Sequence, residues 1–278
     1  MSRSVLLVAL AALAALLSVS PAGAAIPRRI VSLSPTATES LFDIGAGKQV
    51  VAVDDQSDFP KRAPRTSLSG YTPNVEAIAG YRPDLVVLSG DANGVVAGLR
   101  KLGIRVLLQP AATNLAGAYA EIAQLGVITG HKREAAGVVA RMKKVVAKTV
   151  KAVPKRNLTV YHELDPTYYS ATSKTFIGRI YKLFGLRNIA DAADSSGSGY
   201  PQLSGEYIVS SNPSLIVLAD TRCCGQSAAT VASRPGWSGL SAVRNHRVIG
   251  IDDSVASRWG PRIVNFVQAV GKALRRKA

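Results

Sequence analysis

The segment from Gly130 to Pro154, GHKREAAGVVARMKKVVAKTVKAVP, has the residue pattern of one amphipathic helix. Apolar residues recur at three- and four-residue spacing, as at Val138, Met142 and Val146, whereas lysine and arginine fill much of the remainder. At about 1.5 Å per residue this helix is roughly 35 Å long, close to the width of a small domain. It is either a long surface helix of one domain or a connection between two, and the flanking sequence distinguishes these arrangements.

The sequences on the two sides of this helix are alike. The matched segments are Arg29–Leu33 with Leu158–Tyr161, Pro83–Ser89 with Pro213–Ala219, and Gly103–Leu108 with Asn245–Gly250. Glu76 precedes Pro83 by the interval that separates Glu206 from Pro213, and each glutamate begins a short apolar segment. We therefore predict two α/β lobes of similar plan joined by one helix.

The first residues belong to neither lobe. Arg3 is followed by an apolar run over residues 5–17 and by small residues at 22–25, which is typical of an export signal cleaved near Ala24. A membrane anchor is the alternative, but the run is short for a bilayer. No cysteine lies near this region for lipid attachment, so we predict a soluble protein exported to a periplasm. The predicted parts are the signal at 1–25, a lobe at 26–129, the helix at 130–154 and a lobe at 155–278.

The composition favours a folded protein with a basic surface. Of 278 residues, 47% are hydrophobic, which is enough for two domains with their own cores. The net charge of +16 attracts anions. The lysines and arginines are nevertheless dispersed, with no basic stretch interleaved with aromatic residues, so we predict no nucleic-acid partner.

Candidate ligand-binding residues lie in loops, several of which follow predicted strands. Ligands bind at the carboxyl ends of the strands in open α/β sheets, and polar loops follow such ends at Asp54–Pro60, Ser89–Gly94 and Asp220–Gln226. Near the end of the chain, Arg258 and Trp259 offer a cation and a large flat ring. The candidates are Asp55, Gln56, Ser89, Asp91, Tyr168, Tyr200, Arg222, Cys223, Arg258 and Trp259.

Several of these residues also have structural explanations. The aspartates of the first loop do not match the spacing of a calcium loop, so loop polarity and helix capping explain them better than a metal site. Arg258 can cap local carbonyls, and Trp259 can pack in the core. His162 is interpreted as structural, because adjacent strand residues such as His162 and Glu163 point to opposite faces.

Cys223 and Cys224 are the only cysteines of the chain. An oxidising compartment allows a disulfide between them, although neighbouring cysteines close a strained ring. Free thiols explain the pair equally well. A zinc site is the weakest explanation, because no recognisable spacing supplies further ligands.

The chain resembles a known family of exported proteins. The segments that carry the resemblance are RIVSLSPTATESLFDIGAG at 29–47, SDFP at 57–60, PNVEAIAGYRPDLVV at 73–87, PQLSGEYIVSSNPSLIVL at 201–218 and SRWGPRIV at 257–264. They are similar to the periplasmic binding proteins for vitamin B12, ferric siderophores and haem. SDFP, PQLSGE and GPRI look closest to the cobalamin-binding branch.

This resemblance implies both architecture and partners. It implies two α/β lobes joined by a single long rigid helix, with a ligand cleft between the lobes and only small closure on binding. Glu76 and Glu206 match the glutamates that dock on arginines of an ABC importer permease, although a helix N-terminus favours glutamate as well. We expect a monomer that passes a small molecule to the permease and has no cofactor.

The predicted ligand is a corrinoid. Several cleft positions are aromatic in the cobalamin branch; Tyr200 keeps this character, whereas Gln56 and Ser89 do not. A ferric siderophore or haem is the alternative, since all three ligands need a broad cleft with flat contacts and a few polar anchors. The chain is not expected to be an enzyme, because it has no phosphate loop, nucleophile-elbow pattern or metal-ligand cluster. An exported sensor without transport is a further alternative.

Overall fold

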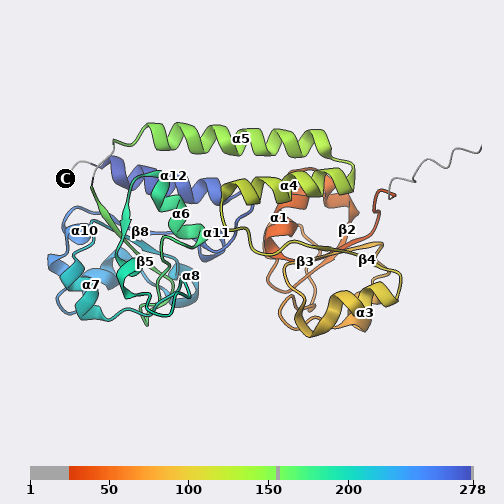
Figure 1. The fold of residues 1–278 in the computed structure, drawn as a ribbon, viewed down its shortest axis with the longest axis horizontal. Helices are drawn as coiled ribbons and strands as arrows, with labels where there is room; N and C mark the ends of the chain where they lie inside the picture. Colours follow the sequence, from red (N-terminus) through yellow and green to blue (C-terminus); the bar gives the residue numbers. More distant parts are fainter. Residues whose placement is uncertain (1–24, 155–156, 277–278) are drawn as a thin grey trace, which may run out of the picture.

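The computed structural model describes residues 25–154 and 157–276, so nearly all of the predicted export signal lies outside the described residues. Two α/β lobes lie side by side beneath the long helix α5, Lys132–Lys151 (Figure 1). Each lobe has one four-stranded parallel sheet. The prediction of two α/β lobes joined by a long helix is confirmed. In the part of the chain that the structure describes, no helix has the length and apolar character needed to span a bilayer.

The N-terminal lobe has the sheet order β2-β1-β3-β4. Its strands are β1 Ile30–Leu33, β2 Val50–Val53, β3 Leu85–Leu88 and β4 Arg105–Leu108. Its helices are α1 Pro35–Asp43, α2 Val75–Ala79, α3 Val95–Lys101 and α4 Leu115–Thr129, with short 3-10 helices at Ala46–Gln49 and Ala92–Gly94.

The C-terminal lobe has the sheet order β6-β5-β7-β8. Its strands are β5 Thr159–Glu163, β6 Arg187–Asn188, β7 Leu215–Leu218 and β8 Val248–Gly250. Its helices are α6 Phe176–Leu183, α7 Gly205–Ser211, α8 Thr221–Cys224, α9 Ala228–Ala232, α10 Ser241–Arg244, α11 Asp253–Ala256 and α12 Ile263–Arg275, with 3-10 helices at Ile189–Ala193 and Trp237–Gly239.

The repeat seen in the sequence is a repeat of topology. The matched segments form β1 and β5, β3 and β7, and β4 and β8, and the members of each pair occupy the same position in their sheets. Strands β1, β3 and β7 are buried along their whole length. Such strands carry apolar residues without alternation because both faces of a parallel sheet are covered.

The long helix α5 rests on one apolar cluster that extends through both lobes. Its buried residues are Ala135, Val138, Met142, Val146 and Thr149, three or four positions apart. The apolar members of this set pack in a cluster with residues of α4, α12 and both sheets. The helix is shorter than the predicted segment 130–154, because Gly130 has a positive φ of 79° and ends α4.

Candidate functional site

Two adjoining cavities lie between the lobes. The first, of about 270 Å³, has Thr113 of the N-terminal lobe on its wall together with Phe176 and Tyr200 of the C-terminal lobe. Trp259 lines this cavity and also the second, of about 440 Å³. Because each cavity takes its walls from both lobes, the predicted cleft between the lobes is present.

The second cavity lies at the carboxyl ends of the strands of the N-terminal lobe. Ser34 follows β1, Asp54 follows β2 and Ser89 follows β3, and all three line the cavity. Asp54 is 1% exposed, and its Oδ1 has no hydrogen-bond partner among the described residues. Burial raises the pKa of Asp54 above its ordinary value. This carboxyl group, which begins the predicted polar loop Asp54–Pro60, is therefore a candidate polar anchor.

A third cavity, of about 390 Å³, adjoins the second. It shares Gln56 and Arg258 with the second cavity and is also lined by Asp55, Arg222 and Cys223. The structure thus brings eight of the ten predicted ligand residues to three neighbouring cavities.

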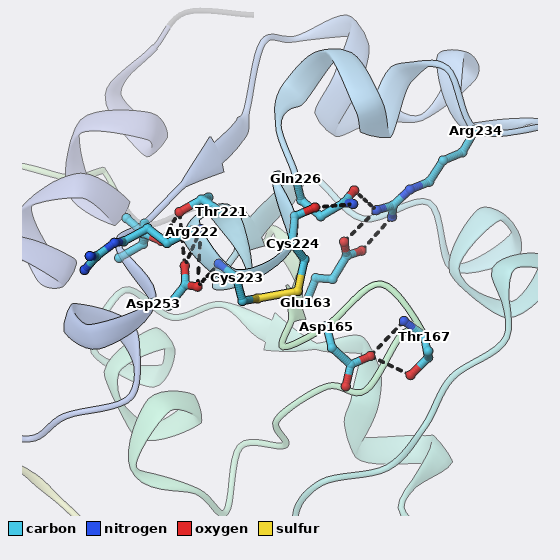
Figure 2. The surroundings of a disulfide bond; sticks show 11 residues. Glu163, Asp165, Thr167, Thr221, Arg222, Cys223, Cys224, Gln226, Arg234 and Asp253 are labelled. Atoms are coloured by element: carbon cyan, nitrogen blue, oxygen red, sulfur yellow. Dashed lines mark hydrogen bonds and ion pairs between the residues drawn. A yellow bond between two sulfur atoms is a disulfide. The ribbon is translucent and has the colours of Figure 1, made fainter. Parts of the chain in front are cut away.

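Next to this third cavity, Cys223 and Cys224 form a disulfide (Figure 2). Of the alternatives that the sequence left open, the structure has the disulfide and no free thiol. The Asp253 carboxylate accepts the backbone N–H of Cys223 at 2.8 Å and that of Arg222 at 3.0 Å. Burial raises the pKa of Asp253, but these N–H groups outweigh it and hold the pKa below its ordinary value. Helix α11 thereby positions the exposed disulfide at the edge of the cleft.

Two arginines of the segment before α12 reach carboxylates of the N-terminal lobe. Glu39 on α1 accepts Nη1 of Arg258 at 3.0 Å and Nε of Arg262 at 2.9 Å. Asp58 accepts the same Nη1 of Arg258 at 2.8 Å. Burial raises the pKa of Asp58, but the hydrogen bond and charge of Arg258 outweigh it, so the pKa is lowered. We call Glu39, Asp58, Arg258 and Arg262 the interlobe charge cluster.

Within this cluster, the guanidinium of Arg258 is already engaged by the protein. Besides the two carboxylates, the carbonyl of Gln56 accepts its Nη2 at 2.8 Å. Arg258 therefore lies in the cavity wall and connects the two lobes through its hydrogen bonds. This arrangement is closer to the predicted capping of local groups than to a cation free to bind ligand.

Trp259 is half-buried and fixed from the N-terminal lobe. Its Nε1 donates to Oε2 of Glu121 on α4 at 2.8 Å. Burial raises the pKa of Glu121, and this hydrogen bond offsets only part of that effect. The tryptophan thus lines both central cavities with its indole nitrogen anchored, instead of packing in the core.

Tyr168 and Asp91 do not line the cavities described above. The ring of Tyr168 stacks on Trp237 with the centroids 5.6 Å apart, and the guanidinium carbon of Arg234 lies 5.3 Å from the Tyr168 centroid. Asp91 accepts the backbone N–H of Val96 at 3.0 Å at the start of α3. Local packing and helix capping therefore use the two side chains that we expected to contact ligand.

The C-terminal lobe contains a buried charged group beneath the disulfide loop (Figure 2). Glu163 at the end of β5 accepts Nη1 and Nη2 of Arg234, each at 2.6 Å, and the same Nη2 donates to Oε1 of Gln226 at 2.7 Å. Asp220 is fully buried, and neither carboxylate oxygen has a partner among the described residues. Burial, followed by the charge of Glu163, raises the pKa of Asp220 to about 7.

We expect Asp220→Asn to remove a pH dependence of stability. The folded protein holds a proton on Asp220 up to about pH 7, whereas an unfolded aspartate releases it near its ordinary pKa of 3.8. The free energy of unfolding therefore falls as the pH rises between these values. Structural relaxation around the buried charge makes the loss of unfolding free energy smaller than the full pKa shift implies. We therefore expect Asp220→Asn to be more stable than the natural protein by about 2 kcal/mol at pH 8 and equally stable at pH 4. Urea unfolding checks this, with Asp165→Asn as control; equal slopes in all three proteins would contradict it.

His162 lies inside the core, as its structural interpretation requires. Its Nδ1 is 2.6 Å from the hydroxyl oxygen of Tyr181, and its ring packs edge-on against Phe266. Burial lowers the pKa of His162 to about 3, so the ring is neutral. In the described part of the chain, no group of three or more histidine, cysteine, aspartate or glutamate residues is arranged to hold a metal ion.

Glu76 and Glu206 occupy equivalent positions on short exposed helices. Each is the second residue of its helix, α2 or α7. The side chain of Asn74 caps α2 by accepting the backbone N–H of Ala77 at 2.8 Å. The side chain of Ser204 caps α7 in the same way by accepting the backbone N–H of Tyr207 at 3.1 Å. Neither glutamate forms an ion pair within the described residues.

Sequence reasoning missed several residues that lie in the cleft or join the two lobes. Glu39 carries no pairing signal, because its arginine partners lie more than two hundred residues away along the chain. Phe176 follows a helix cap and looks like an ordinary core residue, and exposed Tyr71 lies in a turn.

Known proteins match both the sequence and the fold. The family described as periplasmic binding protein matches residues 30–255. A cobalamin-binding protein of Halobacterium salinarum is 34% identical over 257 residues, covering 89% of this chain and 69% of that protein. An uncharacterised ABC transporter substrate-binding lipoprotein of Bacillus subtilis is 30% identical over 260 residues, covering 89% of this chain and 80% of that protein.

A solved structure shows the same architecture. The periplasmic heme binding protein HutB of Vibrio cholerae superposes with a TM-score of 0.78 at 22% identity, covering 89% of this chain and 98% of that one. The matched proteins are binding proteins, which confirms the prediction that the chain is not an enzyme. From the length of the family match and the identity of these relatives, the chain belongs to the periplasmic binding protein family.

Proposed function

We propose that the protein is the exported substrate-binding component of an ABC importer and that its ligand is a corrinoid. The observation that carries this proposal is the pair of cavities that meet at Trp259 and take their walls from both lobes. The relatives named cobalamin-binding proteins support the choice of ligand. In this proposal the lobes at 26–129 and 155–278 hold the ligand about the connection at 130–154, and the protein acts as a soluble periplasmic monomer after loss of residues 1–25.

The chemistry of the cleft suits a corrinoid. A corrin presents flat apolar faces and a rim of amide groups, so it needs aromatic walls and hydrogen-bonding anchors. Tyr200 is 48% exposed on the wall of the first cavity, and Trp259 lines both cavities. Ser34 and Asp54 bring oxygen atoms to the second cavity, where they can accept from amide donors.

Tyr200→Ala and Trp259→Ala should each weaken corrinoid binding by about tenfold, because each removes an aromatic contact worth roughly 1–2 kcal/mol on burial. Isothermal titration with cyanocobalamin measures the change in Kd. Tyr169→Ala is the matched control, because Tyr169 is exposed to a similar degree but lines none of the three cavities. An unchanged Kd in both cleft variants would show that the ligand does not bind in these cavities.

A ferric siderophore or haem is the second candidate ligand. Lys174 is exposed at the first cavity and Arg222 at the third, and both cations suit the carboxylates that such ligands carry. Competition titrations with haem and ferric siderophores separate this ligand class from corrinoids.

Glu76 and Glu206 are the proposed docking residues for the permease. Both side chains are exposed, and they stand at the same position of equivalent helices in the two lobes. The backbone N–H and hydroxyl groups at the start of α7 lower the pKa of Glu206, so it is charged at neutral pH. Two carboxylates on a basic protein suit contact with arginines of a partner, because opposite charges set orientation and encounter rate.

A further inference from the structure

Helices α5, α6 and α12 carry an exposed set of cations and almost no acidic residues. We call these cations the basic face: Lys132, Arg133, Arg141, Lys143, Lys144, Lys148 and Lys151 of α5, Arg179 and Lys182 of α6, and Lys272 and Arg275 of α12. The only acidic residue in the three helices is Glu134, in the first turn of α5. Eleven of the 34 lysines and arginines of the chain therefore lie on one layer of the fold, with a single acidic residue among them.

The three helices pack together into one layer. A Cβ at Gly271 of α12 would lie 2.5 Å from Cγ2 of Thr149 on α5, so these helices are in close contact. The rings of Tyr181 on α6 and Phe266 on α12 have centroids 5.7 Å apart. In Figure 1, α5 runs along the top of both lobes, with α12 and α6 directly beneath it in the C-terminal lobe.

The basic face lies away from the proposed docking helices. Helix α7 lies at the bottom of the C-terminal lobe in Figure 1, and α2 contacts α3, which lies at the bottom of the N-terminal lobe. The molecule therefore has one strongly positive side opposite the side that carries Glu76 and Glu206.

Little within the protein neutralises this positive side. Among the described residues, the only ion pair of the basic face joins Arg141 to Asp43 at 3.2 Å, and both side chains are well exposed. Lys143 lies over the Tyr119 ring, 5.4 Å from its centroid. Of the large apolar side chains on the three helices, only that of Leu183, at the end of α6, is exposed.

We infer that the basic face binds the surface of an anionic lipid bilayer. Helix α5 is about 30 Å long and, with the shorter helices α6 and α12, presents many cations in one array. Each lysine or arginine near an anionic bilayer contributes about 1 kcal/mol. The near absence of exposed apolar side chains implies adsorption without insertion. Single-stranded nucleic acid is disfavoured because its binding sites combine cations with aromatic stacking platforms, which this face lacks. Bilayer binding through α5 leaves the cleft and α2 and α7 exposed.

Vesicle sedimentation tests this inference. The exported protein, as recovered from cells, is mixed with vesicles of phosphatidylcholine alone or with about one-third phosphatidylglycerol. We expect binding to the anionic vesicles only and its loss at about 0.5 M salt, where the Debye length is a few ångströms. Lys144→Glu with Lys148→Glu should weaken binding by at least about tenfold. Arg100→Glu with Lys101→Glu on α3, which changes the net charge equally, should have little effect.

Three outcomes would overturn the inference. Equal weakening by the two double variants would mean that net charge alone attracts the protein. Equal binding to neutral vesicles would mean that apolar residues anchor it. Absence of binding to anionic vesicles at low salt, or tighter binding of a duplex oligonucleotide through Lys144 and Lys148, would exclude a lipid surface as the partner. Circular dichroism of each variant shows whether it is folded.

Discussion

Replacing Glu39 by glutamine is expected to lower the free energy of unfolding by about 3 kcal/mol, because one partner of a buried ion pair is removed while the other stays. The Glu39 side chain is only 2% exposed and accepts from both Arg258 and Arg262. Burial lowers the pKa of Arg262, but the hydrogen bond and charge of Glu39 outweigh it, so the pKa is raised. Glutamine would leave Arg262 without its carboxylate and place an amide donor against it.

A second substitution on the same helix provides the control for Glu39→Gln. Asp43 ends α1 and pairs with Arg141 in solvent, with side chains 40% and 64% exposed. Asp43→Asn should change the free energy of unfolding by less than about 0.5 kcal/mol, because exposed ion pairs contribute little. Urea unfolding at neutral pH measures both variants. Equal, small effects would mean that the interlobe charge cluster does not hold the lobes together.

The double replacement Glu76→Arg with Glu206→Arg is expected to reduce ligand uptake by about a hundredfold or more, because two charge-complementary contacts become repulsive. Ligand affinity should stay within about twofold of that of the natural protein, since neither glutamate lines the cavities described above. Uptake of labelled cyanocobalamin by cells that carry the cognate permease measures the first quantity, and isothermal titration of the purified variant measures the second.

Glu134→Arg tests whether this effect is specific to the docking helices. Glu134 is also an exposed glutamate in the first turn of a helix, but α5 lies on the other side of the molecule (Figure 1). Loss of a favourable charge at a helix N-terminus costs about 0.3–1 kcal/mol in any of the three positions. Uptake should therefore be normal in Glu134→Arg. Normal uptake in the double variant would mean that Glu76 and Glu206 only stabilise the starts of their helices and do not contact the permease.

Much of the fold could be predicted because its signals are local. The strand segments Pro83–Ser89 and Pro213–Ala219 repeat with their preceding glutamates, and both became third strands of parallel sheets. The amphipathic spacing of Val138, Met142 and Val146 located α5. The ends of elements were less accurate, because Gly130 ends α4 with a left-handed backbone instead of starting α5.

For the candidate site, the sequence could predict only which loops contribute residues, from their position at the carboxyl ends of strands. Loops at the carboxyl ends of strands meet in space, and Gln56 and Ser89 of two such loops line the same cavity. What each side chain does there depends on partners distant in sequence. Arg258 is held by Glu39 and Asp58, and Tyr168 is stacked on Trp237. The spacing of residues in the sequence does not predict contacts between side chains that are so far apart along the chain.

Isothermal titration of the exported protein against cyanocobalamin, cobinamide, haem and a set of ferric siderophores tests the central claim most directly. We predict tight one-to-one binding of a corrinoid and no comparable binding of the other ligands. Tight binding of haem or a siderophore without corrinoid binding would contradict the proposed ligand. Absence of binding to every member of this set would contradict the proposed role in capturing a ligand of this importer class.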